Sequence, residues 1–269
     1  MTVIALASIK GSPGVTAAAL ALAWCWPPER SALIECDPAG GDLAASLGLS
    51  TTPGLVSLTA AVRRSPDIDQ VWRHAHALPG GTRVVVAPVG SEQARATVRT
   101  LGESKLVEIL ADAADMVVVI DCGRLDPDSP ALALARQATM VMLCLRPRRD
   151  ELAHLAPRVP ALLRDLPAPR LVLVGPEEFP AREISDAMRM PVIAHLPRDP
   201  HGAGVLFTSG LRKGSAARLP LLRAVRTLAD ELGRSAVFAA ADRRGRRVVP
   251  PNSWGVGWSA GSEREATRS

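Results

Sequence analysis

The chain has 269 residues, of which 47% are hydrophobic and 22% charged, and its formal net charge is +5. This balance is that of a globular protein and excludes wholesale disorder, and the length suits one large α/β domain or at most two small ones. The modest positive charge permits a nucleic-acid or anionic-membrane partner but does not indicate one.

The first apolar stretch, residues 2–8, is too short for the apolar core of a signal peptide and runs directly into a glycine loop. The sequence has no run of eighteen apolar residues that would span a bilayer. We therefore expect a cytoplasmic protein without direct membrane insertion. Four cysteines occur without C-x-x-C spacing, and we interpret them as buried thiols and not as metal ligands or disulfide partners: Cys25, Cys36, Cys122 and Cys144.

Short apolar runs alternate with longer segments of helical periodicity along the chain. The predicted strands are 3–7, 32–36, 83–87, 116–120, 140–145, 171–174 and 192–195. The predicted helices are 16–26, 91–113, 128–137, 150–166, 181–188 and 216–233. This alternation predicts an α/β fold, with a doubly wound, mostly parallel sheet of about seven strands and helices on both faces. We expect one domain over residues 1–235 and a flexible tail rich in Arg, Pro and Gly over 236–269.

The segment that joins the first predicted strand to the first helix reads Lys10-Gly11-Ser12-Pro13-Gly14-Val15-Thr16. Amides at a helix N-terminus and the helix dipole favour an anion, and glycines let the backbone approach it closely. Thr16 has the position of the hydroxyl that holds Mg²⁺ in phosphate loops. Such loops usually carry lysine where this chain has Val15. On this motif alone, a turn that binds no ligand remains the alternative.

Carboxylates follow two of the predicted strands. The second strand ends in Glu35-Cys36-Asp37, and the fourth ends in Asp121-Cys122-Gly123. The carboxyl ends of parallel strands border the edge where open α/β sheets bind ligands, so these acids are candidate site residues. A single carboxylate in the place of Asp121 holds Mg²⁺ through a water in phosphate-loop proteins, although it could instead cap the following turn. We interpret the nearby Asp42 as the N-cap of a short helix.

Taken together, these motifs resemble the ParA/MinD superfamily of deviant phosphate-loop ATPases, whose loop reads K-G-G-x-G-K-T. Lys10, Gly11, Gly14 and Thr16 match that loop, whereas Ser12 and Val15 depart from it. A small apolar residue in the place of Val15 is similar to the CpaE/TadZ-like branch. The resemblance covers roughly residues 1–235 and implies a phosphate-loop NTPase fold with ATP and Mg²⁺ as cofactors.

The resemblance also implies roles for individual residues. Lys10 would reach across a homodimer interface to the partner's nucleotide, with a solvated surface charge as the alternative, and Asp37 would orient a water, so both are catalytic candidates. Thr16 and Asp121 are the candidate metal residues. The segment from Pro197 to Asp199 is similar to the family's adenine loop, although Gly175-Pro176 stands where relatives commonly carry asparagine. The expected nucleotide-binding residues are Gly11, Ser12, Pro13, Gly14, Val15, Thr16, Ala17, Pro197 and Asp199.

The function that the resemblance implies is a nucleotide-controlled dimeric switch, which positions or regulates an unidentified partner assembly of secretion, pilus or cell-division type. Val15 removes a cation from the phosphates, a contact worth about 10²- to 10³-fold in rate, so ATP hydrolysis should be slow or absent. One alternative is a ParA-type chromosome or plasmid partitioning ATPase that binds DNA nonspecifically. Nonspecific DNA binding needs a basic surface patch, and outside the tail only a few basic residues cluster, Arg63 and Arg64 among them. The other alternative is a pseudoenzyme scaffold without nucleotide.

Overall fold

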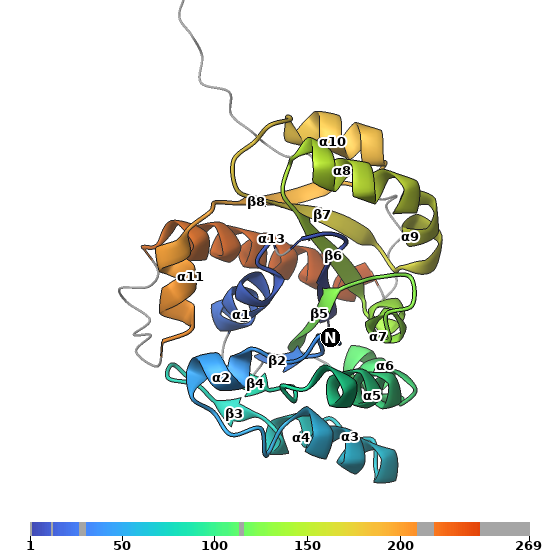
Figure 1. The fold of residues 1–269 in the computed structure, drawn as a ribbon, viewed down its shortest axis with the longest axis vertical. Helices are drawn as coiled ribbons and strands as arrows, with labels where there is room; N and C mark the ends of the chain where they lie inside the picture. The colour runs from blue at the N-terminus through green and yellow to red at the C-terminus, as the bar shows by residue number, and fades with distance from the viewer. Residues whose placement is uncertain (1, 12, 27–30, 113–115, 209–217, 243–269) are drawn as a thin grey trace, which may run out of the picture.

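The structure is a computed structural model that describes residues 2–11, 13–26, 31–112, 116–208 and 218–242 (Figure 1). One eight-stranded sheet forms its centre, in the order β3-β4-β2-β5-β1-β6-β7-β8. The strands are β1 (Thr2–Ser8), β2 (Ser31–Glu35), β3 (His76–Ala77), β4 (Arg83–Val85), β5 (Val117–Arg124), β6 (Met140–Leu145), β7 (Pro169–Val174) and β8 (Val192–Leu196). All neighbouring strands are parallel except β3 and β4. The predicted fold class is therefore confirmed, and β3 is an edge strand that the sequence analysis did not predict.

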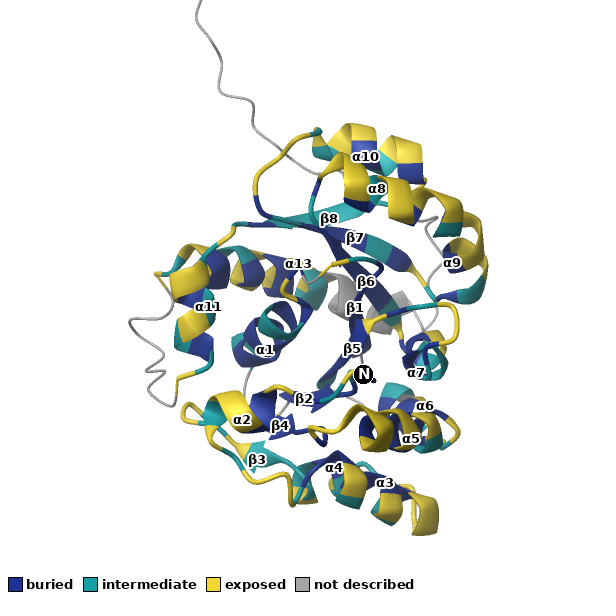
Figure 2. Cartoon of the chain, viewed as in Figure 1, coloured by how far each residue is buried: buried dark blue, intermediate teal, exposed yellow. Residues whose placement is uncertain are grey.

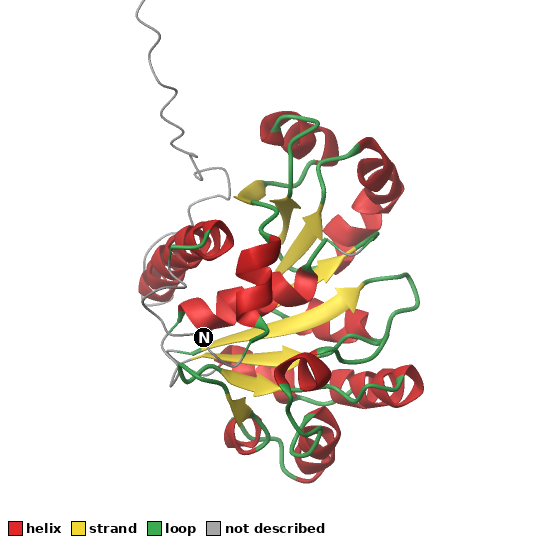
Figure 3. Cartoon of the chain, turned by 60° about the vertical axis from the view of Figure 1, so that its left-hand side comes forward, coloured by secondary structure: helices red, strands yellow, loops and turns green. Residues whose placement is uncertain are grey.

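Helices cover both faces of this sheet (Figure 3). One face carries α1 (Val15–Cys25), α2 (Leu43–Leu47), α11 (Pro200–Leu206) and α13 (Pro220–Asp242). The other carries α3 (Leu55–Arg64), α4 (Asp69–Arg73), α5 (Ser91–Gly102), α6 (Leu106–Asp112), α7 (Ala131–Gln137), α8 (Arg149–Leu155), the 3₁₀ turn η1 (Ala156–Arg158), α9 (Val159–Asp165) and α10 (Ala181–Met188). Within the described residues, no helix combines the length and the apolar character that crossing a bilayer requires.

The central strands are mostly apolar because both of their faces are buried. Along β1, Val3 and Ala5 face the cluster under α3 to α10, while Ile4 and Leu6 face the cluster under α1 and α13. This two-residue alternation between two apolar layers is typical of a parallel sheet covered on both sides. Figure 2 shows the central strands as buried, the edge strands β3 and β8 as partly buried, and the outer helix faces as exposed.

Several helices differ from the predicted ones. The helix predicted over 91–113 ends at Gly102, which packs against Ala133, and a new helix begins at Leu106. The helix predicted over 150–166 is interrupted by η1, where Pro157 and Pro160 lack the amide hydrogens that a continuous helix needs. The last helix runs over Pro220–Asp242. The tail expected over 236–269 thus begins inside α13, and from residue 243 onward it lies outside the described residues.

The connections of the sheet place a ligand-binding edge at the carboxyl end of β1. From β1 the chain enters α1 on one face, whereas the neighbouring strands β5 and β6 lead to α7 and α8 on the other face. A reversal of this kind is a topological switch point, beside which open α/β sheets bind their ligands. The glycine loop after β1 lies at that point.

Candidate functional site

The glycine loop gives α1 an N-terminus without a side-chain cap. Gly11 and Gly14 have positive φ angles of 68° and 93°, which glycine adopts without strain. Gly14 is the N-cap of α1, and its carbonyl accepts a hydrogen bond of 2.9 Å from the amide of Ala18. Gly14 has no side chain with which to cap the helix, and the first turn contains no acidic residue. The amides of this turn can therefore bind an anion.

The other loop residues differ in where their side chains lie. Val15 is buried in the apolar cluster beneath α1 and leaves no polar group at this position in the loop. Thr16, Ala17 and Lys10 are half-buried. Lys10 forms no ion pair with a residue that the structure describes. Pro13 is buried, and Ser12 lies outside the described residues.

Asp121 is a fully buried carboxylate beside the start of α1. In the strand register, Asp121 lies opposite Leu6 of β1 and Glu35 of β2. Its Oδ1 accepts a hydrogen bond of 2.9 Å from the amide of Gly123, whereas Oδ2 has no hydrogen-bond partner among the described residues. Burial raises the pKa of Asp121 to about 7, and an interaction with the Thr16 hydroxyl opposes this increase. A buried acid with an orphaned oxygen needs a proton or a cation.

Asp37 lies close to Asp121 and next to Gly123. The Gly123 backbone has a φ of 57°, and a Cβ atom there would lie only 2.1 Å from Cγ of Asp37. The Oδ1 atom of Asp37 accepts a hydrogen bond of 2.8 Å from the amide of Ala39. Burial raises the pKa of Asp37, and its charge adds to the increase at Asp121. The structure therefore brings Asp37, Asp121 and Thr16 together at the end of the loop.

These residues suit Mg²⁺, which waters and phosphates help to bind, better than they suit a metal that is bound by protein ligands alone. Among the described residues, no group of His, Cys, Asp or Glu side chains forms a metal cage. Mg²⁺ usually keeps several waters and is bound by one or two carboxylates together with substrate phosphates. The orphaned Oδ2 of Asp121, with the Thr16 hydroxyl beside the carboxyl and an anion-binding helix N-terminus next to it, matches those requirements.

Glu35, the last residue of β2, is a structural anchor. Its Oε1 accepts hydrogen bonds of 2.8 Å from the amide of Asp42 and 3.0 Å from that of Leu43, and its Oε2 accepts one of 2.8 Å from Ala87. Burial raises the pKa of Glu35, and these amides oppose the increase. Glu35 thus ties the segment after β2, which contains Asp37, to the residues just beyond β4. Asp42 is the N-cap residue of α2, as predicted, but its side chain makes no cap hydrogen bond.

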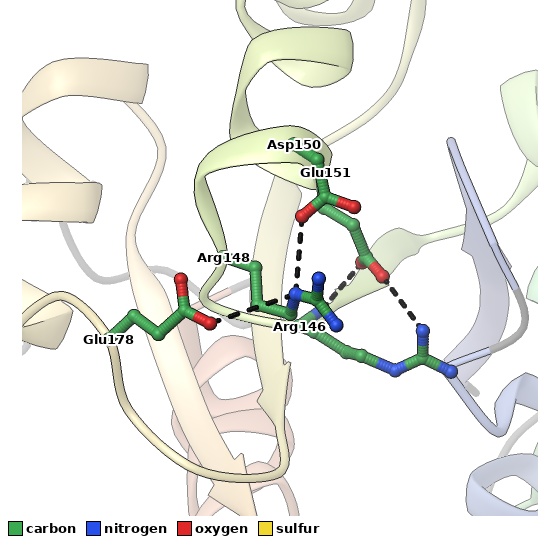
Figure 4. Close-up of polar contacts among 5 residues, drawn as sticks. All are labelled: Arg146, Arg148, Asp150, Glu151 and Glu178. Carbon is green, nitrogen blue, oxygen red and sulfur yellow. Dashed lines mark hydrogen bonds and ion pairs between the residues drawn. The ribbon is translucent and has the colours of Figure 1, made fainter.

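Arg146 and Glu151 form part of this site that the sequence analysis did not identify (Figure 4). Arg146 follows β6, and the buried Glu151 lies in α8. The Oε2 atom of Glu151 accepts a hydrogen bond of 2.7 Å from the amide of Arg146, and Oε1 lies 3.3 Å from Nη1. A Cβ atom on Gly11 would lie 3.2 Å from Oε1 of Glu151 and 3.7 Å from Nη1 of Arg146. The pair therefore lies directly against the glycine loop.

The segment expected to contact a base lies further along the same edge of the sheet. Asp199 is the N-cap of α11, and its oxygens accept hydrogen bonds of 2.8 Å from the amide of Gly202 and 3.2 Å from that of Leu221. The carboxylate thus ties α11 to α13. Pro197 is half-buried, and β8 is separated from β1 by β6 and β7. Gly175, with a φ of 91°, lies at the end of β7 and approaches the side chain of Arg198.

Comparison with known proteins identifies similar folds, although no family model and no curated protein matches the sequence. The structure of a ParA family ATPase from Chlorobium tepidum has a TM-score of 0.69 at 16% identity, over 86% of this chain and 98% of that one. MinD of Pyrococcus horikoshii, solved with Mg-ADP, has a TM-score of 0.67 at 18% identity, over 88% and 98%. The MinC:MinD complex of Aquifex aeolicus gives 0.66 at 13% identity, over 87% and 96%. The chain has the fold of the ParA/MinD ATPases.

Proposed function

We propose that this chain is a ParA/MinD-like ATP-binding protein that acts as a nucleotide-controlled dimeric switch. The observation that carries the proposal is the buried Asp121, whose Oδ2 lacks a partner among the described residues beside the uncapped N-terminus of α1. A phosphate bound with a cation would satisfy both features at once. The fold supports this, since a similar MinD was solved with Mg-ADP.

Each site residue has a distinct role in the proposal. The backbone amides of Gly11 and of residues 14–17 bind the phosphates, and Thr16 and Asp121 hold Mg²⁺, which supplies positive charge to the phosphates when bound. Asp37 orients a water, for which its fixed place against Gly123 is suited. Toward the base, Pro197 contributes the contact surface. Asp199 acts by holding that loop, because its carboxylate is engaged by amides.

Turnover of ATP to ADP and phosphate is slow or absent in this account. Val15 is buried and apolar, so it supplies no charge to the phosphates at the position where the usual loop has lysine. Lys10, which is half-buried and carries no ion pair to a described residue, reaches the partner's nucleotide in a homodimer. Bound nucleotide then controls dimerisation more than it fuels a reaction.

The switch would act on a protein assembly in the cytoplasm. The small apolar Val15 supports the CpaE/TadZ-like branch and hence a secretion or pilus assembly. The similarity to MinD in a complex with MinC supports the general point that proteins of this fold assemble with partners. In this proposal residues 1–235 form the nucleotide-binding domain, and the remaining residues, to 269, serve as a tail.

Equilibrium binding of a fluorescent ATP analogue, with and without Mg²⁺, tests nucleotide binding at this site. The wild-type chain should bind saturably, and affinity should increase with Mg²⁺. Asp121→Asn keeps the shape of the side chain but removes the charge, so it should lose the Mg²⁺-dependent part of the affinity. If the wild type does not bind at millimolar nucleotide, the fold serves as a scaffold without nucleotide and the proposal is wrong.

A further inference from the structure

Arg146 and Gly11 meet because β6 and β1 are neighbours in the sheet. The two strands pair in parallel, with Ala7 opposite Leu143 and Ser8 opposite Cys144, so their carboxyl ends reach the same edge. After this edge β1 turns into α1 on one face, and β6 turns into α8 on the other. The two connections therefore leave the sheet on opposite faces at the topological switch point. Arg146, which directly follows β6, lies beside that point.

Contact between the loop and the pair leaves little room for a side chain at Gly11. A Cβ atom there would lie 3.2 Å from Oε1 of Glu151, tighter than an ordinary contact, and the φ of 68° disfavours any residue other than glycine. The loop backbone thus rests on the Arg146–Glu151 pair. A group bound at Gly11 will therefore lie near the guanidinium.

Glu151 holds Arg146 at two points. The carboxylate is only 4% exposed, and it accepts from the backbone amide of Arg146 through Oε2 and contacts Nη1 through Oε1. The Arg146 side chain is 42% exposed. A guanidinium carries several N–H donors in a planar fork, which lets it bind one carboxylate and a second anion together. Such a fork matches phosphate oxygens in pairs.

We propose that Arg146 supplies, from within the same chain, the phosphate-binding cation that Val15 does not provide, with Glu151 as its positioning residue. The inference rests on the proposed function, because it requires a nucleotide at this loop. It follows from charge: Asp37, Asp121 and Glu151 surround the loop with carboxylates, and a polyanion binds there only if nearby cations offset them. Arg146 is the cation that the fold holds against Gly11.

The test compares Arg146→Met with Arg148→Met in binding of a fluorescent ATP analogue with Mg²⁺ to the full chain. Arg148 is the matched control, since it is two residues away, 51% exposed, and paired with Asp150 at 3.2 Å and Glu178 at 3.7 Å (Figure 4). A charge-assisted contact is worth about a 10- to 100-fold change in Kd, which we expect for Arg146→Met. For Arg148→Met we expect less than about a threefold change.

Each outcome separates this inference from the proposed function. If the wild type binds and Arg146→Met binds within about threefold of it, Arg146 is not the cation, while the proposed function stands. If the wild type does not bind, the proposed function fails and this inference fails with it. The measurement is made at protein concentrations where the chain is monomeric and is repeated at concentrations where it forms dimers. An effect of Arg146→Met confined to dimers would overturn the assignment to the same chain.

A second variant distinguishes a loss of binding from a loss of folding. Arg146→Met removes the guanidinium but keeps the backbone amide of residue 146, so the buried Glu151 loses its opposite charge, and such a loss destabilises proteins strongly. The double variant Arg146→Met with Glu151→Gln removes the cation and the buried charge together. If it melts near the wild-type temperature and binds the analogue about 10- to 100-fold more weakly, the inference is supported. Wild-type affinity in that folded double variant would overturn it, because a purely structural pair would leave binding intact.

Discussion

The carboxylate of Asp37 occupies the space that a side chain on Gly123 would fill, with Cγ only 2.1 Å from the ideal Cβ position. Asp37 follows β2, Gly123 lies near the end of the neighbouring strand β5, and the left-handed φ of Gly123 lets the chain turn beneath the acid. The absence of a side chain at residue 123 thus decides where Asp37 lies relative to Asp121.

Gly123→Ala should therefore lower the free energy of unfolding by about 2 kcal/mol or more, because alanine is strained at this φ and collides with Asp37. Urea denaturation checks this. Gly204→Ala is the matched control, since a Cβ atom at Gly204, within α11, meets nothing within 4 Å. It should be neutral or slightly stabilising. Equal stability of the two variants would contradict the described position of Asp37.

Glu35→Gln should destabilise the fold by roughly 2 kcal/mol, since the carboxylate accepts three amide hydrogens and an amide side chain cannot accept all of them. Asp42→Asn serves as the control, because the exposed Asp42 makes no side-chain cap hydrogen bond and should change stability by less than about 0.5 kcal/mol. Urea denaturation of both variants measures the difference. A Glu35→Gln variant as stable as the wild type would show that the anchor is not needed.

Stability without nucleotide should depend on pH through Asp121. Its folded-state pKa of about 7 lies above the ordinary value of 3.8, so between these values the folded chain binds the extra proton. Its contribution to stability is therefore greatest at acidic pH and is lost as the pH rises through about 7. Asp121→Asn should remove this loss and be more stable than the wild type at about pH 8. Urea denaturation of both proteins across this range would refute the account if the two pH dependences were parallel.

The sequence predicted the parts of the site that are local. The glycine loop and Asp37 each follow a strand and Asp121 lies near the end of one, so the rule that parallel strands end at one edge was sufficient to group them with Thr16. The Arg146–Glu151 pair was not predictable in this way. Its contact with Gly11 depends on β6 lying next to β1, and a crossover of that kind leaves no signal in the chain.

The fold was predictable wherever elements are long and periodic. The strand over Met140–Leu145 and the helix over Ala181–Met188 have the predicted bounds. β3 has only two residues and cannot show a period. By contrast, α3 buries Leu55, Leu58 and Val62 at helical spacing, so this helix was predictable from the sequence and was missed.

Phosphate release from ATP by the monomeric chain should be close to background. The loop lacks the lysine that stabilises developing charge, and comparable contacts are worth about 10²- to 10³-fold in rate. Val15→Lys should increase the rate in protein that keeps its fold, which a melting curve verifies because Val15 is buried. Sustained turnover by the wild-type monomer would contradict the assigned role of Val15.

The central claim is a nucleotide-controlled dimer, and the most direct measurement follows the mass of the particle while a labelled ATP analogue binds with Mg²⁺. The wild type and Lys10→Ala are compared at the same concentrations. The account predicts saturable binding with a shift from monomer to dimer mass in the wild type, and loss of that shift in Lys10→Ala. A wild-type chain that binds the analogue and stays monomeric, or that dimerises equally without it, would contradict the account.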